Sequence, residues 1–513
     1  MDTSSAKPDL AERVNAFVKW LFEGYKATPP RGPKVINDAL LGNLFFSRHE
    51  VAVIDCPILQ RLRRIKQTGL VYYVYPSATH SRFEHSLGAA ALSERCFDAI
   101  QERAAVEGTG PLADPDRSKG DLAHLRMAAL LHDVGHGLCS HASEQIYELH
   151  SDLQEFKSNP AYAANQPGEV LSYLIVRSPT FREWFAEHVV EECHADLNLE
   201  TISNLILGKH DDPDKYFLAN IVSSGYDCDK LDYIARDSYY CGLALTVDLP
   251  RFYSMISTAR YSDHRRVLVL RSYVPLEQIL FSKMTLFGSV YHHQKVKCLD
   301  SMLRSMVEHI LDNPDQSSFR VRGGISVSFG DPVQYLYVTD DEFFSQAKGF
   351  GDPYTKLMLN RFRNRDLFVR CLEISRRTVR SESWEGYGRQ KLIDLAKEPE
   401  RLATLETEIH KRLGVAERGK CNKHDIRLSI PGLPGIKTAN SLIQTDKDST
   451  IQHVEEFFPL EQWTGAYAHN KWRSFVYAPR EIARTVRDAA ISVLHNETGL
   501  EINSDNSNQT CKL

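Results

Sequence analysis

The chain has 513 residues, of which 42% are hydrophobic and 25% are charged, and its formal net charge is −5. Such a composition is typical of a globular protein with a large core and two or more packing units. The small negative charge excludes a global basic field, so contact with nucleic acid would depend on local basic patches.

No stretch approaches the roughly 18 consecutive apolar residues that span a bilayer, and the sequence does not open on a basic region followed by an apolar run. We therefore expect neither a membrane segment nor a secretory signal. The ten cysteines contain no C-x-x-C pair, which favours reduced thiols and a cytoplasmic location.

The predicted elements begin with a short amphipathic helix that ends before the turn-rich segment 29–33. From Lys34 to about residue 312 the pattern is mainly helical. Apolar residues recur at helical spacing in four segments of this part, namely 121–132, 170–176, 202–207 and 297–310.

The character of the sequence changes after residue 313. Here we predict strands at 319–329, 333–338 and 367–375, a charged helix at 391–413, an extended segment at 425–436 and a closing helix at 479–494. The predicted fold is therefore mainly α, with a large helical core and a smaller C-terminal α+β portion. Its predicted parts are an N-terminal helix and linker (1–33), a helical domain (34–312), the α+β portion (313–503) and a disordered tail (504–513).

The adjacent pair His132 and Asp133 ends an apolar stripe and is followed by Gly135 and Gly137. Neighbouring side chains on a helix point about 100° apart, so both can reach one point only where the helix ends or bends. Burial of two polar side chains at such a place is costly unless they are paired or bind a metal. Taken alone, the pair could equally be a surface pair.

Two further segments place this pair in a longer pattern, the order H…HD…D. His85 lies upstream in SRFEHSLG, and Asp229 lies downstream in YDCDKLDY. This order resembles that of the HD phosphohydrolase superfamily.

Longer motifs resemble one branch of that superfamily, the dNTP triphosphohydrolases, which include the SAM-and-HD-domain proteins and the bacterial dGTPase-like enzymes. The motifs are KVIND at 34–38, IDCP at 54–57, QRLRRIKQ at 60–67, HSRFEHSLG at 80–88 and DKLDYIARD at 229–237. The resemblance covers about residues 34–310 and implies that 34–312 is an HD domain. Too few residues precede Lys34 for a SAM domain, so none is expected there.

The resemblance implies a divalent metal held by His85, His132, Asp133 and Asp229. Manganese, iron, magnesium and zinc all suit a site of nitrogen and oxygen ligands, so the sequence does not choose between them.

Hydrolysis at an α-phosphorus needs an activated water, neutralised phosphate charge and help for the leaving oxygen. The resemblance assigns phosphate contacts to Arg82, Lys230 and Lys283, although Lys283 could be an ordinary solvated lysine. For proton transfer the candidates are His136, His141 and Glu144. The last two are three residues apart, on one face of a helix if the segment is helical, and a capping role is their structural alternative.

One departure from the family concerns segment 165–169. The family carries a His-Glu pair there for acid–base catalysis, whereas this chain has Asn165, which cannot act as a general acid at neutral pH. Another group could replace it, water activation could be organised differently, or turnover could be weak. His150, His188 and His194 are histidines nearby in sequence.

For the nucleoside, the resemblance implies that Tyr233 packs against the sugar and leaves little room for a 2′-hydroxyl, which would favour deoxyribose. Asp237 would bond the 3′-hydroxyl, Tyr291 would stack on the base beside His293, and Gln67 would contact the base edge. The preferred base is not readable.

The resemblance also implies a second, activating nucleotide site between subunits of a homo-oligomer, a dimer or tetramer, with residues 313–503 in regulation and oligomerisation. The matching residues are Lys34, Asn37, Asp55, Gln60, Arg61 and Arg63. A polar network that ties the first helices together would explain the same residues.

The leading hypothesis is thus a metal-dependent enzyme that converts dNTPs to deoxynucleoside and triphosphate. An HD phosphodiesterase or nuclease would use the same ligands in a more open groove. A nucleotide-sensing subunit with weak activity, for example in anti-phage defence, is the alternative from a different class.

Overall fold

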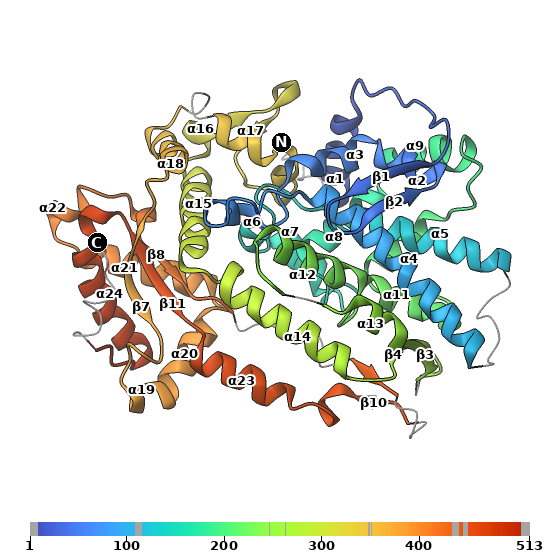
Figure 1. Cartoon of the computed structure of the whole chain (residues 1–513). Coiled ribbons are helices and arrows are strands. Elements are labelled where there is room, and N and C mark those ends of the chain that lie inside the picture. Colours follow the sequence, from blue (N-terminus) through green and yellow to red (C-terminus); the bar gives the residue numbers. More distant parts are fainter. Residues whose placement is uncertain are drawn as a thin grey trace.

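The computed structural model describes residues 9–107, 115–245, 247–261, 263–346, 349, 351–432, 441–444 and 450–503. These residues are mainly helical, with a few short strands, which confirms the predicted fold class (Figure 1). The predicted disordered tail, 504–513, lies outside the described residues.

Helix α4 (Arg82–Val106) is the central helix of the larger part and packs against α5 (Pro115–Leu131) and α12 (Cys228–Tyr240). A capping box of Ser81 and Glu84 fixes the start of α4. Asp227 caps α12 by accepting the amide of Lys230. The first turns of both helices are therefore held in place, and these turns carry site residues.

The predicted N-terminal helix is α1 (Leu10–Phe22), which starts at a capping box of Asp9 and Glu12. Val14, Phe17 and Val18 are fully buried. They join the same core as α8 (Pro167–Arg177) and α9 (Pro179–Phe185), so α1 is part of the helical body.

Strands interrupt the part that the sequence predicted as helical. Strands β1 (Lys34–Asp38) and β2 (Gly42–Phe46) form an antiparallel hairpin. Strands β3 (Ile256–Arg260) and β4 (Arg266–Leu270) form a second pair, which β9 (Leu442–Ile443) and β10 (Gln452–His453) extend to four strands.

The smaller part is built on a three-stranded antiparallel sheet in the order β7 (Val369–Ile374), β11 (Ser474–Ala478) and β8 (Arg427–Ser429). Three helices pack with it: α20 (Tyr387–Leu395), α21 (Pro399–Arg412) and α24 (Ala483–Thr498). The strand predicted at 367–375 and the closing helix predicted at 479–494 are present, as β7 and α24. The single helix predicted at 391–413 is wrong: the range holds parts of two helices, α20 and α21, because Pro399 starts a new helix after residues 396–398.

The strand predicted at 333–338 is wrong: this segment is the 3₁₀ helix η7 (Pro332–Tyr337). Asp331 accepts the amide of Val333 and Pro332 occupies the first helical position, so local capping decides the conformation. The segment 319–329 holds only the two-residue strands β5 (Phe319–Arg320) and β6 (Ser326–Val327).

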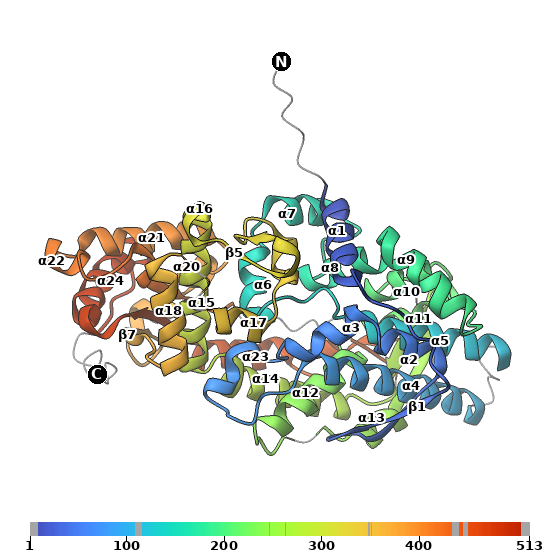
Figure 2. The same cartoon turned by 90° about the horizontal axis from the view of Figure 1, so that it is seen from above.

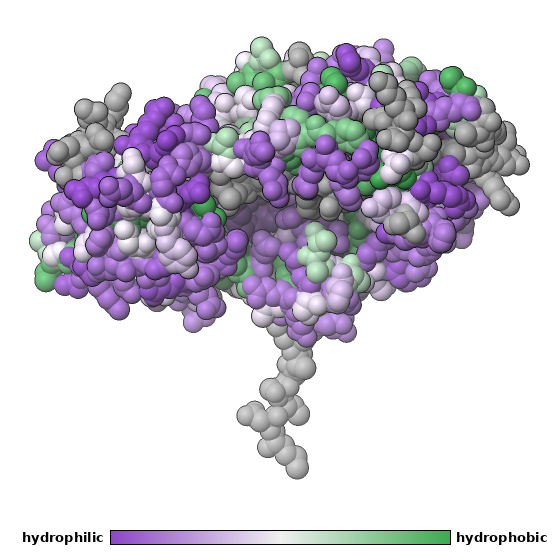
Figure 3. All heavy atoms as spheres, turned by 90° about the horizontal axis from the view of Figure 1, so that it is seen from below, coloured by the Kyte–Doolittle hydropathy of each residue, from purple (hydrophilic) through white to green (hydrophobic). Residues whose placement is uncertain are grey.

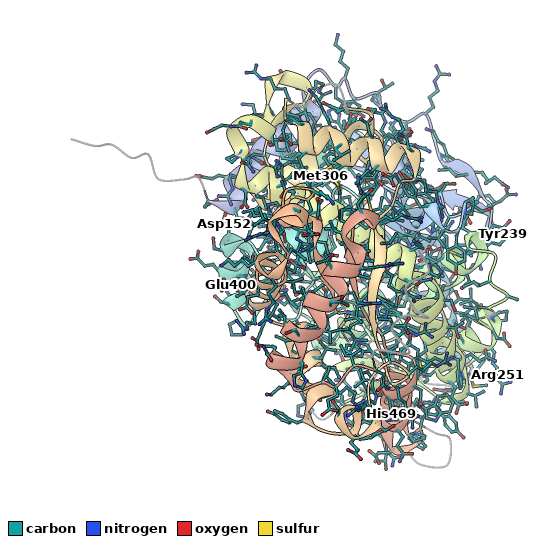
Figure 4. All side chains as sticks on the ribbon, turned by 90° about the vertical axis from the view of Figure 1, so that its left-hand side faces the viewer. Asp152, Tyr239, Arg251, Met306, Glu400 and His469 are labelled. Atoms are coloured by element: carbon teal, nitrogen blue, oxygen red, sulfur yellow. The ribbon has the colours of Figure 1, made fainter. Side chains whose placement is uncertain are left out.

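The two parts have separate hydrophobic cores, and the smaller core takes its buried residues from Val369 onward. Buried residues of 319–368 belong to the larger core, so the cores divide later in the chain than the proposed limit at 312/313. Helix α15 (Gln294–Asp312) stands between the parts, and its Met306 is fully buried. Figure 4 labels this residue, and it shows Glu400 of α21 at the margin of the molecule.

The C-terminal segment returns to the larger part. Helix α23 (Leu460–Asn470) runs beside α14 (Val274–Leu286) in both Figure 1 and Figure 2, and the rings of Phe281 and Trp463 are 4.2 Å apart. Seen from below, the surface is largely hydrophilic and hollowed near its middle (Figure 3). Among the described residues, every helix is too short or too polar to cross a bilayer.

Candidate metal centre and active site

Three helices bring the four predicted metal ligands together. His85 lies in the first turn of α4 and Asp229 in the first turn of α12, while His132 and Asp133 follow the last residue of α5. The chain turns sharply at Gly135, where a Cβ atom would come within 2.3 Å of the carbonyl oxygen of Gly168. The end of the helix lets two adjacent side chains face one point, as the sequence predicted.

The ligand atoms converge closely. The Nε2 atoms of His85 and His132 are 3.3 Å apart, and His85 Nε2 lies 3.1 Å from Asp229 Oδ1. With His132 Nε2, these atoms all lie within 4.8 Å of one another. The Asp133 carboxylate is 3.5 Å from His85 Nε2 and 3.4 Å from His132 Nε2.

The far side of each histidine ring is anchored. His85 Nδ1 lies 2.8 Å from Asp232, and His132 Nδ1 lies 2.7 Å from the carbonyl oxygen of Ala129. Donation from Nδ1 in both rings leaves both Nε2 lone pairs facing the two carboxylates. The Nε2 atoms of His85 and His132 and the Oδ1 atom of Asp229 repel one another unless a cation lies between them, so these three residues fit a divalent metal, with the Asp133 carboxylate beside them.

The electrostatics of the site also fit a bound cation. Burial opposes a charge on His85, but hydrogen bonds to Asp229 and Asp232 outweigh it and raise its pKa to about 10. Burial also opposes ionisation of Asp133 and Asp229. Arg82 nevertheless holds the pKa of Asp133 well below its usual range, and the two histidines do the same for Asp229. The centre therefore favours positive charge.

The support of His85 extends further along α12 and to β1. Asp232 accepts two hydrogen bonds from Arg236, at 2.7 and 2.9 Å, and Arg236 also donates to Asp38 at 2.8 Å. A Cβ atom at Gly88 would come within 2.0 Å of Asp232, so only glycine leaves room for this carboxylate. Asp232 lies within a motif of the sequence, but its role was not predicted.

A second cluster adjoins the metal ligands and contains the three predicted proton-transfer residues. His136 Nε2 is 3.2 Å from Asp133, and its ring contacts that of His141 edge-on at 5.3 Å. His141 Nδ1 is 2.7 Å from Glu144, whose other oxygen accepts the amide of Gly168 at 2.9 Å. The His141 side chain is 66% exposed and Glu144 is buried, so the histidine faces solvent on a buried anchor.

Arg82 links the two clusters. Its guanidinium donates to Asp133 at 2.5 Å, to Ser140 Oγ at 2.6 Å and towards His141 Nε2 at 3.2 Å. Arg82 and Asp133 are both buried. The predicted phosphate-binding arginine thus lies against both the metal ligands and the proton-transfer histidine.

The predicted nucleoside contacts lie along α12. Asp229, Tyr233 and Asp237 are four residues apart, hence on one helix face over about 12 Å. The Tyr291 hydroxyl donates to Asp237, and His80 contacts the other oxygen of Asp237 at 2.8 Å. His80, which stacks on Tyr240, was not predicted as a site residue, although it lies in the HSRFEHSLG motif.

The remaining predicted substrate residues make local contacts that do not by themselves indicate a substrate. Lys230 pairs with Asp227 at 2.7 Å, and Lys283 lies over the Phe287 ring at 5.8 Å. Gln67 is buried, and its side-chain oxygen lacks a hydrogen-bond partner among the described residues. His293 caps α15 by accepting the amide of Lys295 at 3.2 Å.

Five of the six residues predicted for a second nucleotide site interact locally. Lys34 pairs with Asp55 at 2.5 Å, Asn37 donates to Asn43 at 3.0 Å, Arg63 donates to Gln60 at 2.8 Å, and Gln60 to the carbonyl oxygen of Ile54 at 2.8 Å.

Arg61 lies apart from these five. It is buried and donates to the carbonyl oxygens of Val134 at 2.8 Å, His136 at 2.6 Å and Leu336 at 3.4 Å. In this conformation Arg61 braces the turn after the metal ligands and does not present its charge to a nucleotide.

Asn165 is also buried. Its amide donates to Glu169 at 2.9 Å and to the carbonyl oxygen of Leu207 at 3.4 Å, at the start of α8. Of the nearby histidines, His188 pairs with Glu192 at 3.1 Å, and the His150 ring is 6.3 Å from that of Tyr335.

Comparison with known proteins agrees with this geometry. The HD domain family model matches residues 82–237, and the model of the HD associated region matches residues 247–505, about half of the chain. The chain therefore belongs to the HD-domain phosphohydrolase family, and it has a His/Asp group that could hold a divalent metal.

Several relatives are similar over much of the chain. An uncharacterized protein of Methanocaldococcus jannaschii is 25% identical, over 89% of this chain and 81% of its own length. The deoxynucleoside triphosphate triphosphohydrolase SAMHD1 homolog of Dictyostelium discoideum is 29% identical, over 66% of this chain and 60% of its own. For the SAMHD1 enzyme of Homo sapiens the identity is 27%, over 60% and 50%. The chain thus spans only about half to three fifths of the two named triphosphohydrolases.

Proposed function

We propose that the protein hydrolyses deoxynucleoside triphosphates to a deoxynucleoside and triphosphate. The observation that carries this proposal is the alignment of Asp229, Tyr233 and Asp237 on one face of α12, with Tyr291 bonded to the last of them. Along this face the expected metal ligand Asp229 comes first, then Tyr233, expected beside the sugar, and then Asp237, expected to accept from the 3′-hydroxyl. This order matches the order of the parts of a nucleotide. The names of the similar triphosphohydrolases support the same substrate class.

A divalent metal held by His85, His132, Asp133 and Asp229 would supply Lewis acidity toward a phosphate oxygen and the attacking water. Arg82 offers a planar guanidinium to the phosphates. Because Glu144 holds the Nδ1 proton of His141, the Nε2 lone pair of His141 faces Arg82. When Arg82 turns to a phosphate, this nitrogen becomes free to take or return a proton.

The test is the product formed from each dNTP, alone and in mixtures, with manganese present. We expect inorganic triphosphate, and we expect the His132→Ala variant to release none. His469→Ala is the matched control, because His469 pairs with Glu385 and lies outside the His/carboxylate groups of the described residues that could hold a metal. Release of mononucleotides from single-stranded DNA, with no product from dNTPs, would show a nuclease or phosphodiesterase instead. Nucleotide binding without turnover would show a sensor.

Selection of deoxyribose is the second element of the proposal. Tyr233 lies one helical turn beyond Asp229, where its ring would crowd a 2′-hydroxyl. We expect Tyr233→Ala to reduce the dNTP preference over the matching NTP by about tenfold or more, measured as the ratio of kcat/KM values. An unchanged ratio would remove the steric explanation.

The proposal includes a homo-oligomer, a second nucleotide site and a cytoplasmic location. The half-exposed pair of Lys34 and Asp55 and the neighbouring Gln60 and Arg63 remain candidates for a nucleotide contact, and the described cysteines are all free thiols. Light scattering with and without a dNTP mixture tests the first two. The mass should rise with nucleotide in the wild type and not in Lys34→Ala.

A further inference from the structure

Ser140, which accepts a hydrogen bond from Arg82, lies in a loop with an unfavourable backbone conformation. Cys139 and Ser140, neither of them glycine, have φ angles of +53° and +56°. L-residues rarely adopt positive φ, and two in succession persist only where surrounding contacts enforce them.

This loop sets the position of Arg82. Ser140 Oγ accepts the Nε–H of Arg82 at 2.6 Å and donates to the carbonyl oxygen of Gln67 at 3.1 Å. The other guanidinium nitrogens of Arg82 reach Asp133 and His141. A shift of Ser140 would therefore move the link between the two clusters.

The contacts that enforce the loop come from a distant segment. Asp340, the first residue of α17 (Asp340–Ser345), is 3% exposed. One of its carboxylate oxygens accepts the amide of Cys139 at 2.6 Å, and the other accepts the amide of Lys66 at 2.9 Å. The carbonyl oxygen of Tyr335 accepts the amide of Leu138 at 3.2 Å in the same region.

An ordinary structural role does not explain Asp340. Thr339, not Asp340, caps α17, with its hydroxyl accepting the amide of Glu342. The side-chain ammonium of Lys66 lies 3.4 Å from Asp341. The Asp340 carboxylate instead accepts hydrogen bonds from two backbone amides, those of Lys66 and Cys139. Both amides belong to loops that lead into the active site.

We propose that Asp340 is a positioning residue, whose carboxylate clamps the 66–67 and 139–140 loops and so holds Arg82 and His141 against the metal ligands. The clamp itself follows from the contacts of Asp340. Its effect on turnover rests on the proposed dNTP hydrolysis.

The test compares Asp340→Asn with Asp341→Asn. Both remove one carboxylate charge, but the Asp341 side chain is 75% exposed and pairs with the Lys66 ammonium at the surface. In Asp340→Asn the new NH₂ group faces one of the two amides and cannot accept from it. With metal content equal, we expect kcat for dNTPs to fall about 10- to 100-fold in Asp340→Asn, with KM within about twofold. Asp341→Asn should resemble the wild type.

Amide hydrogen exchange gives a readout without substrate. Peptides that cover 134–144 should exchange about tenfold faster in Asp340→Asn than in Asp341→Asn. Adding Cys139→Gly should restore part of kcat, because glycine adopts positive φ freely and needs no clamp; a general loss of stability would not be restored.

Equal exchange and equal kcat in the two Asn variants would overturn the proposal. If the wild type hydrolyses no dNTP, the proposed function fails, and the exchange rates alone decide whether Asp340 clamps the loop. Should Asp340→Asn lower metal content to the same extent as it lowers kcat, Asp340 would be a support of the metal centre and not of Arg82.

Discussion

Glu144 is a buried carboxylate that the active site keeps ionised. Burial alone would raise its pKa, but the charge of His136 and the hydrogen bonds from His141 and Gly168 lower it to about 2. The ionised carboxylate fixes the tautomer of His141, so the proton-transfer residue depends on the state of its neighbour.

This depressed pKa predicts a pH dependence of stability. A carboxyl with a folded-state pKa of about 2 contributes stability above its ordinary pKa of 4.5 and loses it as the pH falls towards 2. At pH 7 this contribution is roughly 3 kcal/mol. We expect Glu144→Gln to be less stable than the wild type at pH 7 by about this amount, with the difference shrinking between pH 5 and pH 3.

Urea unfolding of the metal-free proteins at several pH values measures this difference, because metal loss in acid then plays no part. A difference that stays constant from pH 7 to pH 3 would show that folding does not lower the pKa of Glu144.

At the scale of elements, the start of α8 closes the back of the catalytic cluster. Gly168 donates its amide to Glu144, and a Cβ atom there would lie 2.7 Å from the His136 ring. Gly120, by contrast, lies in α5 with nothing within 4 Å of its Cβ position. Two helical glycines thus differ in what surrounds them.

We expect Gly168→Ala to destabilise the protein by about 1–3 kcal/mol and to reduce turnover, because His136 must move. Gly120→Ala should leave turnover unchanged and stabilise the protein by up to about 1 kcal/mol, since it removes a flexible residue from a helix. Thermal unfolding and dNTP turnover of both variants test this. Equal effects of the two substitutions would mean that the packing at His136 is not tight.

Motifs predicted which side chains lie together, whereas periodicity misplaced elements such as the strand expected at 333–338. The convergence of His132 and Asp133 follows from local sequence, because the helix ends after Leu131. Asp340 carries no such signal, since its contact with Cys139 spans 201 residues. Arg61 lies in a motif, yet sequence alone does not show that its guanidinium is turned inward to Val134 and His136.

At the scale of the whole molecule, a buried ion network joins the two cores. Arg427 of β8, 1% exposed, donates to Glu308 of α15 at 2.5 and 3.1 Å and lies 3.3 Å from Glu406 of α21. Two carboxylates from different elements thus share one guanidinium where α15 meets the smaller sheet.

We expect Arg427→Met to destabilise the protein by roughly 3–5 kcal/mol, because the buried Glu406 loses its ion pair, while Glu308 retains Arg304. Arg380→Met removes the exposed pair with Glu501 and should cost less than about 1 kcal/mol. Chemical unfolding of both variants makes the comparison. A small effect of Arg427→Met would show that the carboxylates become neutral or hydrated without cost.

The clamp that Asp340 forms on the 139–140 loop also has a consequence during synthesis of the chain. Cys139 and its partner Asp340 are 201 residues apart, which corresponds to roughly 10–40 s of synthesis. For about half of that time, after Asp229 has been added, a nascent chain contains all four predicted metal ligands while Tyr335, Leu336 and Asp340 have not yet been added. The ligands are encoded early and the support of the loop late, so a chain that stops in between carries a metal site without a finished catalytic loop.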